Sequence, residues 1–354
     1  MATFLTATIN FFVYHFVSGQ AFFSGNALLP AGILLSTFTR RRLWRITGRA
    51  MLLSGAGVIT ISATPLSMTV YLAWGILTVV WFVAIESGRV KNRSQRIPLA
   101  LCATLPLLFT TAAEVPYHVA PSVPEHSYDT VYILGDSLAA GMRGQDEHTW
   151  PSLLREKLRG VTVQDLAHPG ATVHSALGRQ TNGLKKNRAV VLLEIGGNDL
   201  LGDTSPARFA DNLDALLETV SGPGRLVVLL ELPLPPFENA YGKAQRRLAA
   251  KHGAVLIPKS YMAGILLNPE NTIDGIHLSR PGHRTMASML RKLLSPALAH
   301  MPEEADLRRL PMLMAIVSLL LSPPLQGGSV YVPTPDQVGT IWSRRDGPFL
   351  DKGR

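Results

Sequence analysis

The chain has 354 residues and a formal net charge of +9, with 47% hydrophobic and only 17% charged residues. Soluble domains carry roughly 25% charged residues, so this composition excludes a disordered chain and argues against a wholly soluble one. The single cysteine, Cys102, excludes an internal disulfide and a zinc site built from cysteines.

The positive charge is concentrated in the first third of the chain. Residues 1–113 hold nine basic residues and one acidic residue, whereas residues 114–354 are almost neutral. The basic residues form two short clusters, at 40–49 and 89–96, between long uncharged stretches. Because basic loops of this kind stay on the cytoplasmic side of a membrane, the pattern indicates a membrane topology and no nucleic-acid partner.

Three uncharged stretches predict membrane-spanning helices. Residues 1–39 and 50–85 are each long enough for two crossings of a ~30 Å hydrocarbon core, and residues 97–113 for one. A turn is expected at Ser18–Gln20. Because both basic clusters must lie inside, we predict an all-α transmembrane region of about five helices in residues 1–115, with the N-terminus inside and residue 115 onward outside. No basic residue precedes the first apolar run, so a cleaved signal peptide is not expected.

Prolines in residues 116–128 indicate a linker, and from 129 to 300 strands and helices alternate. This alternation, with strands apolar on both faces, predicts an α/β domain whose five-strand parallel sheet is covered on both sides. Strands are expected at Thr130–Leu134, Val161–Leu166, Ala189–Ile195, Arg225–Glu231 and Ala254–Ile257, and helices at Trp150–Leu158, Pro206–Val220, Glu238–His252 and Pro281–Leu294.

A tail follows at residues 301–354. It contains a short apolar segment at 312–325, whose core of ten residues is too short for an ordinary span. We favour an interfacial or docked helix over a sixth crossing.

Polar residues with catalytic potential follow the predicted strands. Ser137 follows the first strand, Gly170 the second and Asn198 the third, and Asp274 with His277 precedes the last helix. The carboxyl ends of parallel strands meet at one edge, where open α/β folds bind ligands. A serine, hydrogen-bond donors and a histidine with a carboxylate would together supply a nucleophile, an oxyanion hole and a base.

These motifs resemble those of the SGNH (GDSL) hydrolases. In the family's order, the first, second, third and fifth blocks are matched by Ile133–Gly141, Gly170, Gly196–Asp199 and Asp274–His277. Two further stretches, Thr149–Pro151 and Leu193–Ile195, resemble the bacterial periplasmic thioesterase/lysophospholipase branch. The resemblance covers residues 129–296 and implies a flavodoxin-like, three-layer fold.

The resemblance also implies a role for each matching residue. Ser137 would be the nucleophile, His277 the general base and Asp274 the group that orients the imidazole. The oxyanion hole would consist of the backbone N–H groups of Ser137 and Gly170 and the side-chain amide of Asn198. Many relatives have a proline after the catalytic histidine, where this chain has Leu278, a departure that concerns the rigidity of the loop.

Residues around these groups have supporting or binding roles in this interpretation. Asp136 and Asp199 would not touch the substrate, but would fix the backbone of the loops that carry Ser137 and Asn198. Two apolar loops are candidates for the walls of an acyl pocket, although ordinary loop packing explains them equally well: Leu200, Leu201, Leu232, Pro233 and Leu234. The mechanism requires neither a metal nor another cofactor.

The sequence therefore predicts a multi-pass esterase of the bacterial cytoplasmic membrane with its catalytic domain outside. Its partners would be the lipid bilayer and an acyl ester or thioester, such as a lysophospholipid, hydrolysed through an acyl-enzyme. One alternative is an O-acetyl esterase or acetyltransferase acting on a cell-envelope glycan. Another is a non-catalytic membrane binding or structural protein, against which the intact catalytic set argues. The sequence leaves the oligomeric state open.

Overall fold

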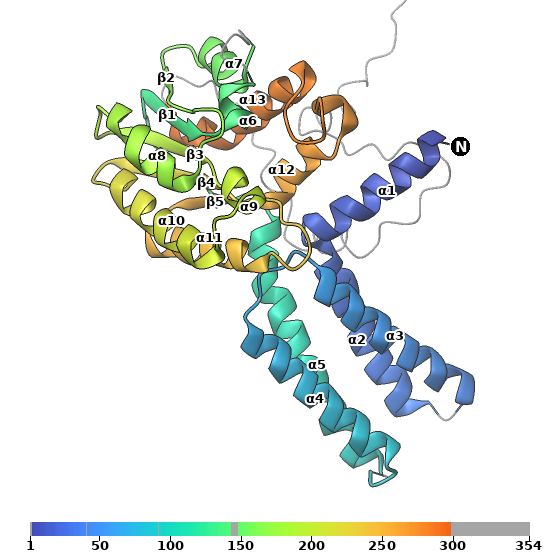
Figure 1. Ribbon diagram of the computed structural model, residues 1–354. Helices are drawn as coiled ribbons and strands as arrows, with labels where there is room; N and C mark the ends of the chain where they lie inside the picture. The colour runs from blue at the N-terminus through green and yellow to red at the C-terminus, as the bar shows by residue number, and fades with distance from the viewer. Residues whose placement is uncertain (1, 40, 91, 143–147, 299–354) are drawn as a thin grey trace, which may run out of the picture.

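The computed structural model describes residues 2–39, 41–90, 92–142 and 148–298, and side chains from residue 8 onward. A long helical region lies below an α/β domain (Figure 1). The predicted apolar segment at 312–325 lies outside the described residues.

Five α-helices and one 3-10 helix precede the first strand in the described part of the chain. Three helical segments in the described part are long and apolar enough to cross a membrane: Gln20–Phe38, Met68–Glu86 and Arg93–His118. The third of these joins α5 to a short 3-10 helix. The helices of this region are α1 (Ala2–Val17), α2 (Gln20–Phe38), α3 (Arg42–Ile61), α4 (Met68–Glu86), α5 (Arg93–Glu114) and η1 (Val115–His118).

Glycines bring α2 and α3 into close contact. A Cβ atom on Gly25 would lie 2.7 Å from the carbonyl oxygen of Gly55, and one on Gly32 would lie 2.6 Å from that of Gly48. Small residues at such crossings let two backbones approach closely, which is a common way of packing helices in a membrane. The two helices therefore form one antiparallel hairpin, and α4 with α5 forms the second (Figure 1).

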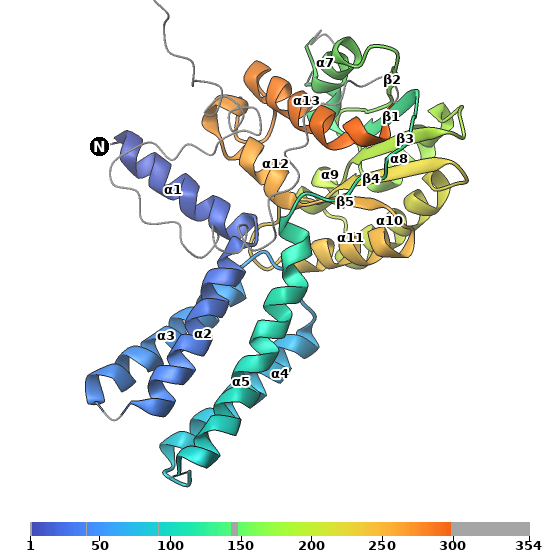
Figure 2. The ribbon, with the colours of Figure 1, turned by 180° about the vertical axis from the view of Figure 1, so that it is seen from behind.

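Helix α1 departs from the predicted topology. The chain turns at Gly19, whose φ of 85° is left-handed, close to the predicted position. However, α1, which precedes this turn, runs beside α12 (Lys259–Leu266) of the α/β domain. It does not pack antiparallel along α2 (Figure 2). The backbone N–H of Ala63 donates to the carbonyl of Phe16 at 3.1 Å. This bond holds the C-terminal end of α1 next to the C-terminal end of α3.

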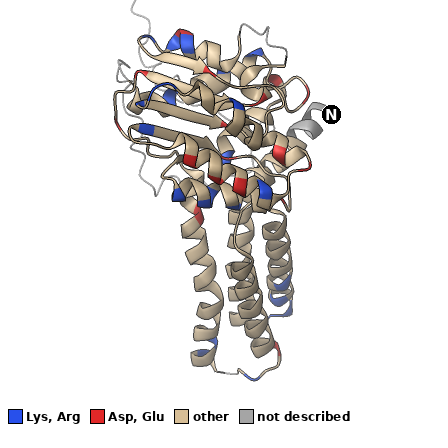
Figure 3. Ribbon diagram, turned by 60° about the vertical axis from the view of Figure 1, so that its left-hand side comes forward, with Lys and Arg blue, Asp and Glu red and all other residues tan. Residues whose placement is uncertain are grey.

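The bundle consequently consists of the four helices α2 to α5, whereas the sequence predicted a transmembrane region of about five helices. The α2–α3 and α4–α5 connections both lie at the end remote from the α/β domain, and Figure 3 shows basic residues there. Helix α1 starts beside the α/β domain, so the N-terminus lies at the same end of the bundle as that domain. This arrangement differs from the predicted topology, in which the N-terminus and the catalytic domain lie on opposite sides.

The α/β domain is built on five parallel strands in the order β2-β1-β3-β4-β5. The two central strands pair in register through Val131 with Val190 and Ile133 with Leu192. All residues of these two strands are buried, because helices cover both faces. The strands are β1 (Thr130–Gly135), β2 (Thr162–Asp165), β3 (Ala189–Glu194), β4 (Arg225–Leu230) and β5 (Val255–Ile257).

Two hydrophobic cores enclose the sheet. One face packs on α7 (Trp150–Lys157), α12 and α13 (Arg280–Leu294), and the other on α8 (Val173–Arg179), α10 (Pro206–Val220) and α11 (Asn239–Lys251). The predicted α/β class, the five-strand parallel sheet and the three layers are confirmed.

A buried group of four charges joins the bundle to the α/β domain. Arg246 of α11 donates two hydrogen bonds to Glu114 of α5, at 2.8 and 2.9 Å, and one to Glu231 at 2.7 Å. Lys259 Nζ lies 3.8 Å from Glu231 and donates to the carbonyl of Ala63. These four side chains are at most 8% exposed, and we call them the joint network.

The joint network lies at the carboxyl edge of the sheet. Glu231 directly follows β4, and Lys259 is two residues beyond β5. The α3–α4 connection contributes Ala63 to the same hydrophobic core as Leu232. Because parallel strands share one carboxyl edge, the bundle contacts the edge at which the catalytic groups were predicted.

Candidate active site

A tight turn places Ser137 at the end of β1. Ser137 opens the short helix α6 (Ser137–Ala140), and Asp136 caps it by accepting a hydrogen bond from the N–H of Leu138 at 3.0 Å. A Cβ atom on Gly135 would lie 2.9 Å from the Cβ of Ala139, so only glycine fits beneath this turn. Gln180 fixes the Gly135 backbone through two hydrogen bonds of 2.9 Å. The serine is therefore held half-buried on a rigid turn.

His277 and Asp274 form a pair in the loop before α13. Their side chains meet at 2.7 Å through His277 Nδ1 and Asp274 Oδ2. The other oxygen of Asp274 accepts from the N–H groups of Ile276 and His277, at 3.0 and 2.8 Å. The imidazole and these N–H groups hold the pKa of the Asp274 carboxyl well below its usual range.

This pairing determines what the imidazole can do. A carboxylate only accepts hydrogen bonds, so Nδ1 carries the proton and Nε2 of the neutral ring is left with a free lone pair. A nitrogen in that state is suited to take a proton from a serine hydroxyl. The His277 side chain is 26% exposed, so a substrate can reach it.

The two predicted oxyanion loops are tied together. Asn198 lies in α9 (Gly197–Leu201), directly after β3, and its amide donates to the carbonyl of Ala171 at 3.0 Å. Asp199 Oδ2 accepts from the N–H of Val173 at 2.8 Å. These bonds connect the Asn198 loop to the segment that starts at Gly170, where φ is 72°. Asp199 therefore connects the two loops, and its supporting role stays a prediction.

Two buried carboxyls lie beneath the Ser137 turn. Burial raises the pKa of Asp136 to about 6, while the nearby His277 acts against this shift. Burial also raises the pKa of Glu194 well above its ordinary value. Glu194 pairs in register with Gly135 and is 1% exposed, and its Oε2 has no hydrogen-bond partner among the described residues.

The sequence interpretation gave Glu194 no role in the site. A signal was present, because Glu194 is the one charged residue in the strand AVVLLE, which is otherwise apolar. The structure places this carboxyl group beside Gly135, beneath the turn that carries the predicted nucleophile.

The predicted acyl pocket is only partly open to solvent. Leu232 and Leu234 are 4% and 0% exposed and pack in the core with α10 and α11, so they do not line an open surface. Leu200 is half-buried against the same core, whereas Leu201 is 67% exposed. Pro233 is half-buried between the two core leucines. Of this set, only Leu201 is mostly exposed, and its place in an acyl pocket stays a prediction.

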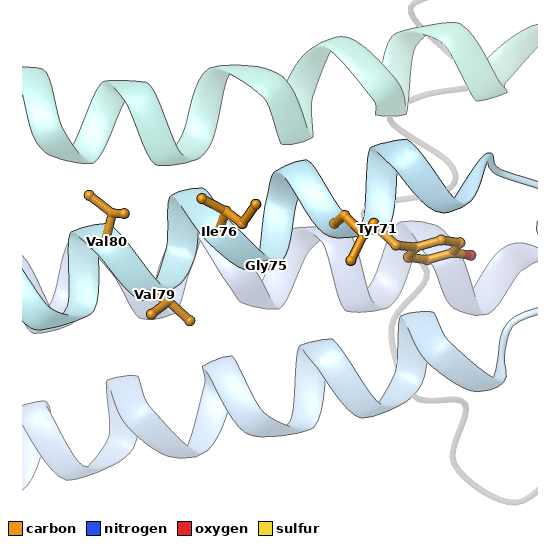
Figure 4. A pocket seen from close by; sticks show the side chains of 6 residues that line it. Tyr71, Gly75, Ile76, Val79 and Val80 are labelled. Atoms are coloured by element: carbon orange, nitrogen blue, oxygen red, sulfur yellow. The ribbon is translucent and has the colours of Figure 1, made fainter.

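The apolar groove found in the helical region is separate from this site. It follows one face of α4 (Figure 4) and is lined by Tyr71, Leu72, Gly75, Ile76, Val79 and Val80. Its lining contains no nucleophile paired with a base, so it does not compete with the Ser137 turn as a catalytic centre.

A serine at the end of β1, a histidine–carboxylate pair and two linked donor loops at one sheet edge define an ester hydrolase. The chain belongs to the GDSL-like lipase/acylhydrolase family, whose model matches residues 133–285.

Three relatives carry names of ester-cleaving enzymes. The thioesterase 1/protease 1/lysophospholipase L1 of Escherichia coli strain K12 is 32% identical over 180 residues, which cover 49% of this chain and 86% of the relative. An arylesterase of Vibrio mimicus is 29% identical, covering 44% of this chain and 83% of the relative. The esterase TesA of Pseudomonas aeruginosa is 28% identical, with coverages of 42% and 79%.

Proposed function

We propose that this protein is a membrane-anchored serine esterase in which Ser137, His277 and Asp274 hydrolyse acyl esters or thioesters outside the cytoplasmic membrane. The observation that carries the chemistry is the 2.7 Å bond between His277 Nδ1 and Asp274, at the edge where β1 delivers Ser137. Family membership and the names of the relatives support the same reaction class.

The reaction follows from the roles of these groups. Ser137 Oγ forms a bond to the acyl carbon while its proton passes to His277 Nε2. The bond from the acyl carbon to the leaving oxygen or sulfur then breaks, and the leaving group takes the proton from His277. A water molecule repeats the sequence, so that the acid leaves and Ser137 regains its proton. Donors from Gly170, Ser137 and Asn198 stabilise the oxyanion of each tetrahedral intermediate.

The proposed location rests on the bundle. Both basic connections lie at the end remote from the α/β domain, and basic loops remain cytoplasmic. We therefore divide the chain into a membrane region at 1–115, a linker at 116–128 and a hydrolase domain at 129–300. Reporters fused in the 40–49 and 89–96 loops should read cytoplasmic, whereas fusions at the N-terminus and after residue 120 should read extracytoplasmic. A cytoplasmic reading at 120 would overturn this placement.

A turnover panel tests the chemistry directly. Purified full-length protein is assayed with p-nitrophenyl esters of increasing acyl length, a lysophospholipid, an acyl-CoA and an acetylated glycan. We expect hydrolysis of acyl esters that is abolished in Ser137→Ala, with fluorophosphonate labelling lost in the same variant. Activity confined to the acetylated glycan would favour the O-acetyl esterase alternative. Labelling of another serine in an active Ser137→Ala variant would contradict the assignment.

A further inference from the structure

Exposed apolar side chains on the described part of the hydrolase domain are confined to one edge. Among residues 129–142 and 148–298, the exposed large apolar residues are Met142, Leu201, Phe237, Ile273 and Ile276, with exposed fractions from 45% to 73%. We call this set the apolar rim. Met142, Leu201 and Phe237 lie in the segments that follow β1, β3 and β4, and the two isoleucines flank Asp274. The connections at the opposite edge, which precede β2, β3, β4 and β5, contribute none.

Phe237 is the unusual member of the rim. Its side chain is 73% exposed, and its φ of 74° is the only positive value at a non-glycine residue in the described chain. A bulky residue in this conformation is strained, and such strain gathers at functional positions. An aromatic ring is thus held outside the protein core at a backbone position that an asparagine or glycine would occupy more easily.

Phe237 also lies at the level where the bundle ends. Two residues further on, the Asn239 amide donates to the carbonyl of Ser62 at 3.2 Å. Ser62 is the residue that caps the C-terminal end of α3. Two residues span at most about 7 Å, so Phe237 is close to this end of the bundle. In a chain that spans a membrane, aromatic residues at this level sit in the interfacial layer.

Helix α1 also exposes apolar side chains near this end of the bundle. It runs beside α12, outside the bundle, in both views (Figure 1 and Figure 2). It has no Asp, Glu, Lys or Arg, and Ile9, Phe11 and Phe12 are about half exposed. Apolar side chains that are exposed next to a membrane span gain free energy when lipid replaces the water around them.

We propose that Phe237 and the exposed residues of α1 enter the outer leaflet of the membrane, and that they hold the catalytic edge at the bilayer surface. This inference rests on the proposed function and specifies its substrate as an amphipathic lipid ester of the same membrane. The carboxyl edge of the sheet carries both the attachment to the bundle and the catalytic groups. The joint network fixes this edge to the bundle, and Ser137, Asn198 and His277 lie along it. The substrate then moves sideways from the leaflet into the site, and its acyl chain does not have to cross water.

Depth-dependent quenching tests the membrane contact without measuring activity. Phe237→Cys and Asn187→Cys are each made in a Cys102→Ser background and labelled with an environment-sensitive fluorophore. The full chain is placed in phosphatidylcholine–phosphatidylglycerol vesicles that contain spin-labelled lipid. Asn187 is exposed at the opposite edge, before β3. We expect strong quenching and a blue-shifted emission at 237 and neither at 187. Equal emission at the two positions would overturn the proposal and would leave water or a protein partner as the environment of Phe237.

Kinetics separate this inference from the proposed function. Phe237→Asn removes the ring and suits the positive φ, and Phe237→Tyr keeps an interfacial aromatic as the matched control. We expect Phe237→Asn to hydrolyse a soluble p-nitrophenyl ester at the wild-type rate but a lysophospholipid in vesicles about tenfold more slowly, because one buried aromatic anchor is lost. Phe237→Tyr should match the wild type on both substrates. Unchanged vesicle turnover in Phe237→Asn would refute the inference, whereas wild-type protein that hydrolyses neither substrate would refute the function.

Discussion

Removal of the Glu114 charge tests how the hydrolase domain is held on the bundle. The joint network contains two carboxylates and two cations, so its charges balance within a buried site. Glu114→Gln keeps the shape of the side chain but leaves Arg246 and Lys259 facing the single carboxylate of Glu231. The bidentate contact at 2.8 and 2.9 Å is replaced by an amide that offers one acceptor.

The expected cost follows from this imbalance. Removing one partner of a buried ion pair typically costs about 3–5 kcal/mol, because the remaining charge is left without compensation. Burial lowers the pKa of Lys259 to about 8. The loss of a nearby carboxylate lowers it further, so Lys259 can release its proton and reduce the penalty. We expect Glu114→Gln to lose about 3 kcal/mol at pH 7 and less at pH 9. Glu114→Leu with Arg246→Met should lie within ~1 kcal/mol of the wild type, since apolar replacements of a buried pair are often neutral.

Thermal unfolding of the full chain in detergent, followed by near-UV circular dichroism, measures the effect. Turnover of a soluble ester at low temperature shows that each variant still folds. The expected order of midpoints is wild type close to the double variant, with Glu114→Gln clearly lower. A single variant as stable as the wild type, or a double variant as unstable as the single one, would refute this account of the joint.

Further outcomes concern the site and the joint. Ser137→Ala and His277→Ala should each remove nearly all hydrolysis, and the double variant should be little worse in kcat/KM because the two groups act as one unit. Asn198→Ala should lower kcat by a factor on the order of 10²–10³, since it deletes one oxyanion donor, with KM changing less. The folded state releases the Lys259 proton near pH 8, below the ordinary value of 10.5. Between about pH 8 and pH 10.5, the free energy of unfolding of the wild type should therefore rise relative to that of Lys259→Met. Unfolding midpoints measured against pH would show this.

The α/β domain was predictable because its signals are local. Strand β3 is a continuous apolar run, and its predicted start at Ala189 is where the strand begins. The Ser205 hydroxyl caps α10 by accepting from the N–H of Arg208, as its position before a proline suggests. Parallel strands then require Ser137 and Asn198 to share an edge. The pairing of Asp274 with His277 follows from their spacing of three residues in one loop.

The helical region was predictable only in part, since hydropathy counts crossings but does not give directions. Positive charge predicts one common side for both basic loops, yet the path of α1 depends on contacts with residues far along the chain. The ring of Tyr14 lies against Gly264 of α12, and the end of α1 is bonded to Ala63. Dependence on distant contacts also explains why the residues of the acyl pocket were not predicted reliably. An apolar loop residue such as Leu234 packs inward or outward according to its neighbours, here Gly242 and the core shared with α10 and α11.

Glu194 provides a last test of how the site is built. Its carboxyl is fully enclosed beneath Gly135, and burial raises its pKa well above the usual range. Between the ordinary pKa of a glutamate and this raised value, the folded state keeps a proton that the unfolded state has lost. Folding therefore becomes less favourable as pH rises through that window, by up to about 1.4 kcal/mol per pH unit.

Glu194→Gln removes the titration and keeps the volume of the side chain. We expect this variant to resemble the wild type at low pH and to become increasingly more stable than it as the pH rises above the ordinary pKa of a glutamate, as measured by unfolding midpoints. Glu156→Gln on the exposed face of α7 is the control, because that side chain lies in water in both states. A constant difference across pH, or a Glu194→Gln variant that is less stable than the wild type at pH 8, would mean that Glu194 is ionised and paired in the folded enzyme. The Ser137 turn would then rest on a buried charge, and not on a neutral acid that supports the turn without competing with His277 for a proton.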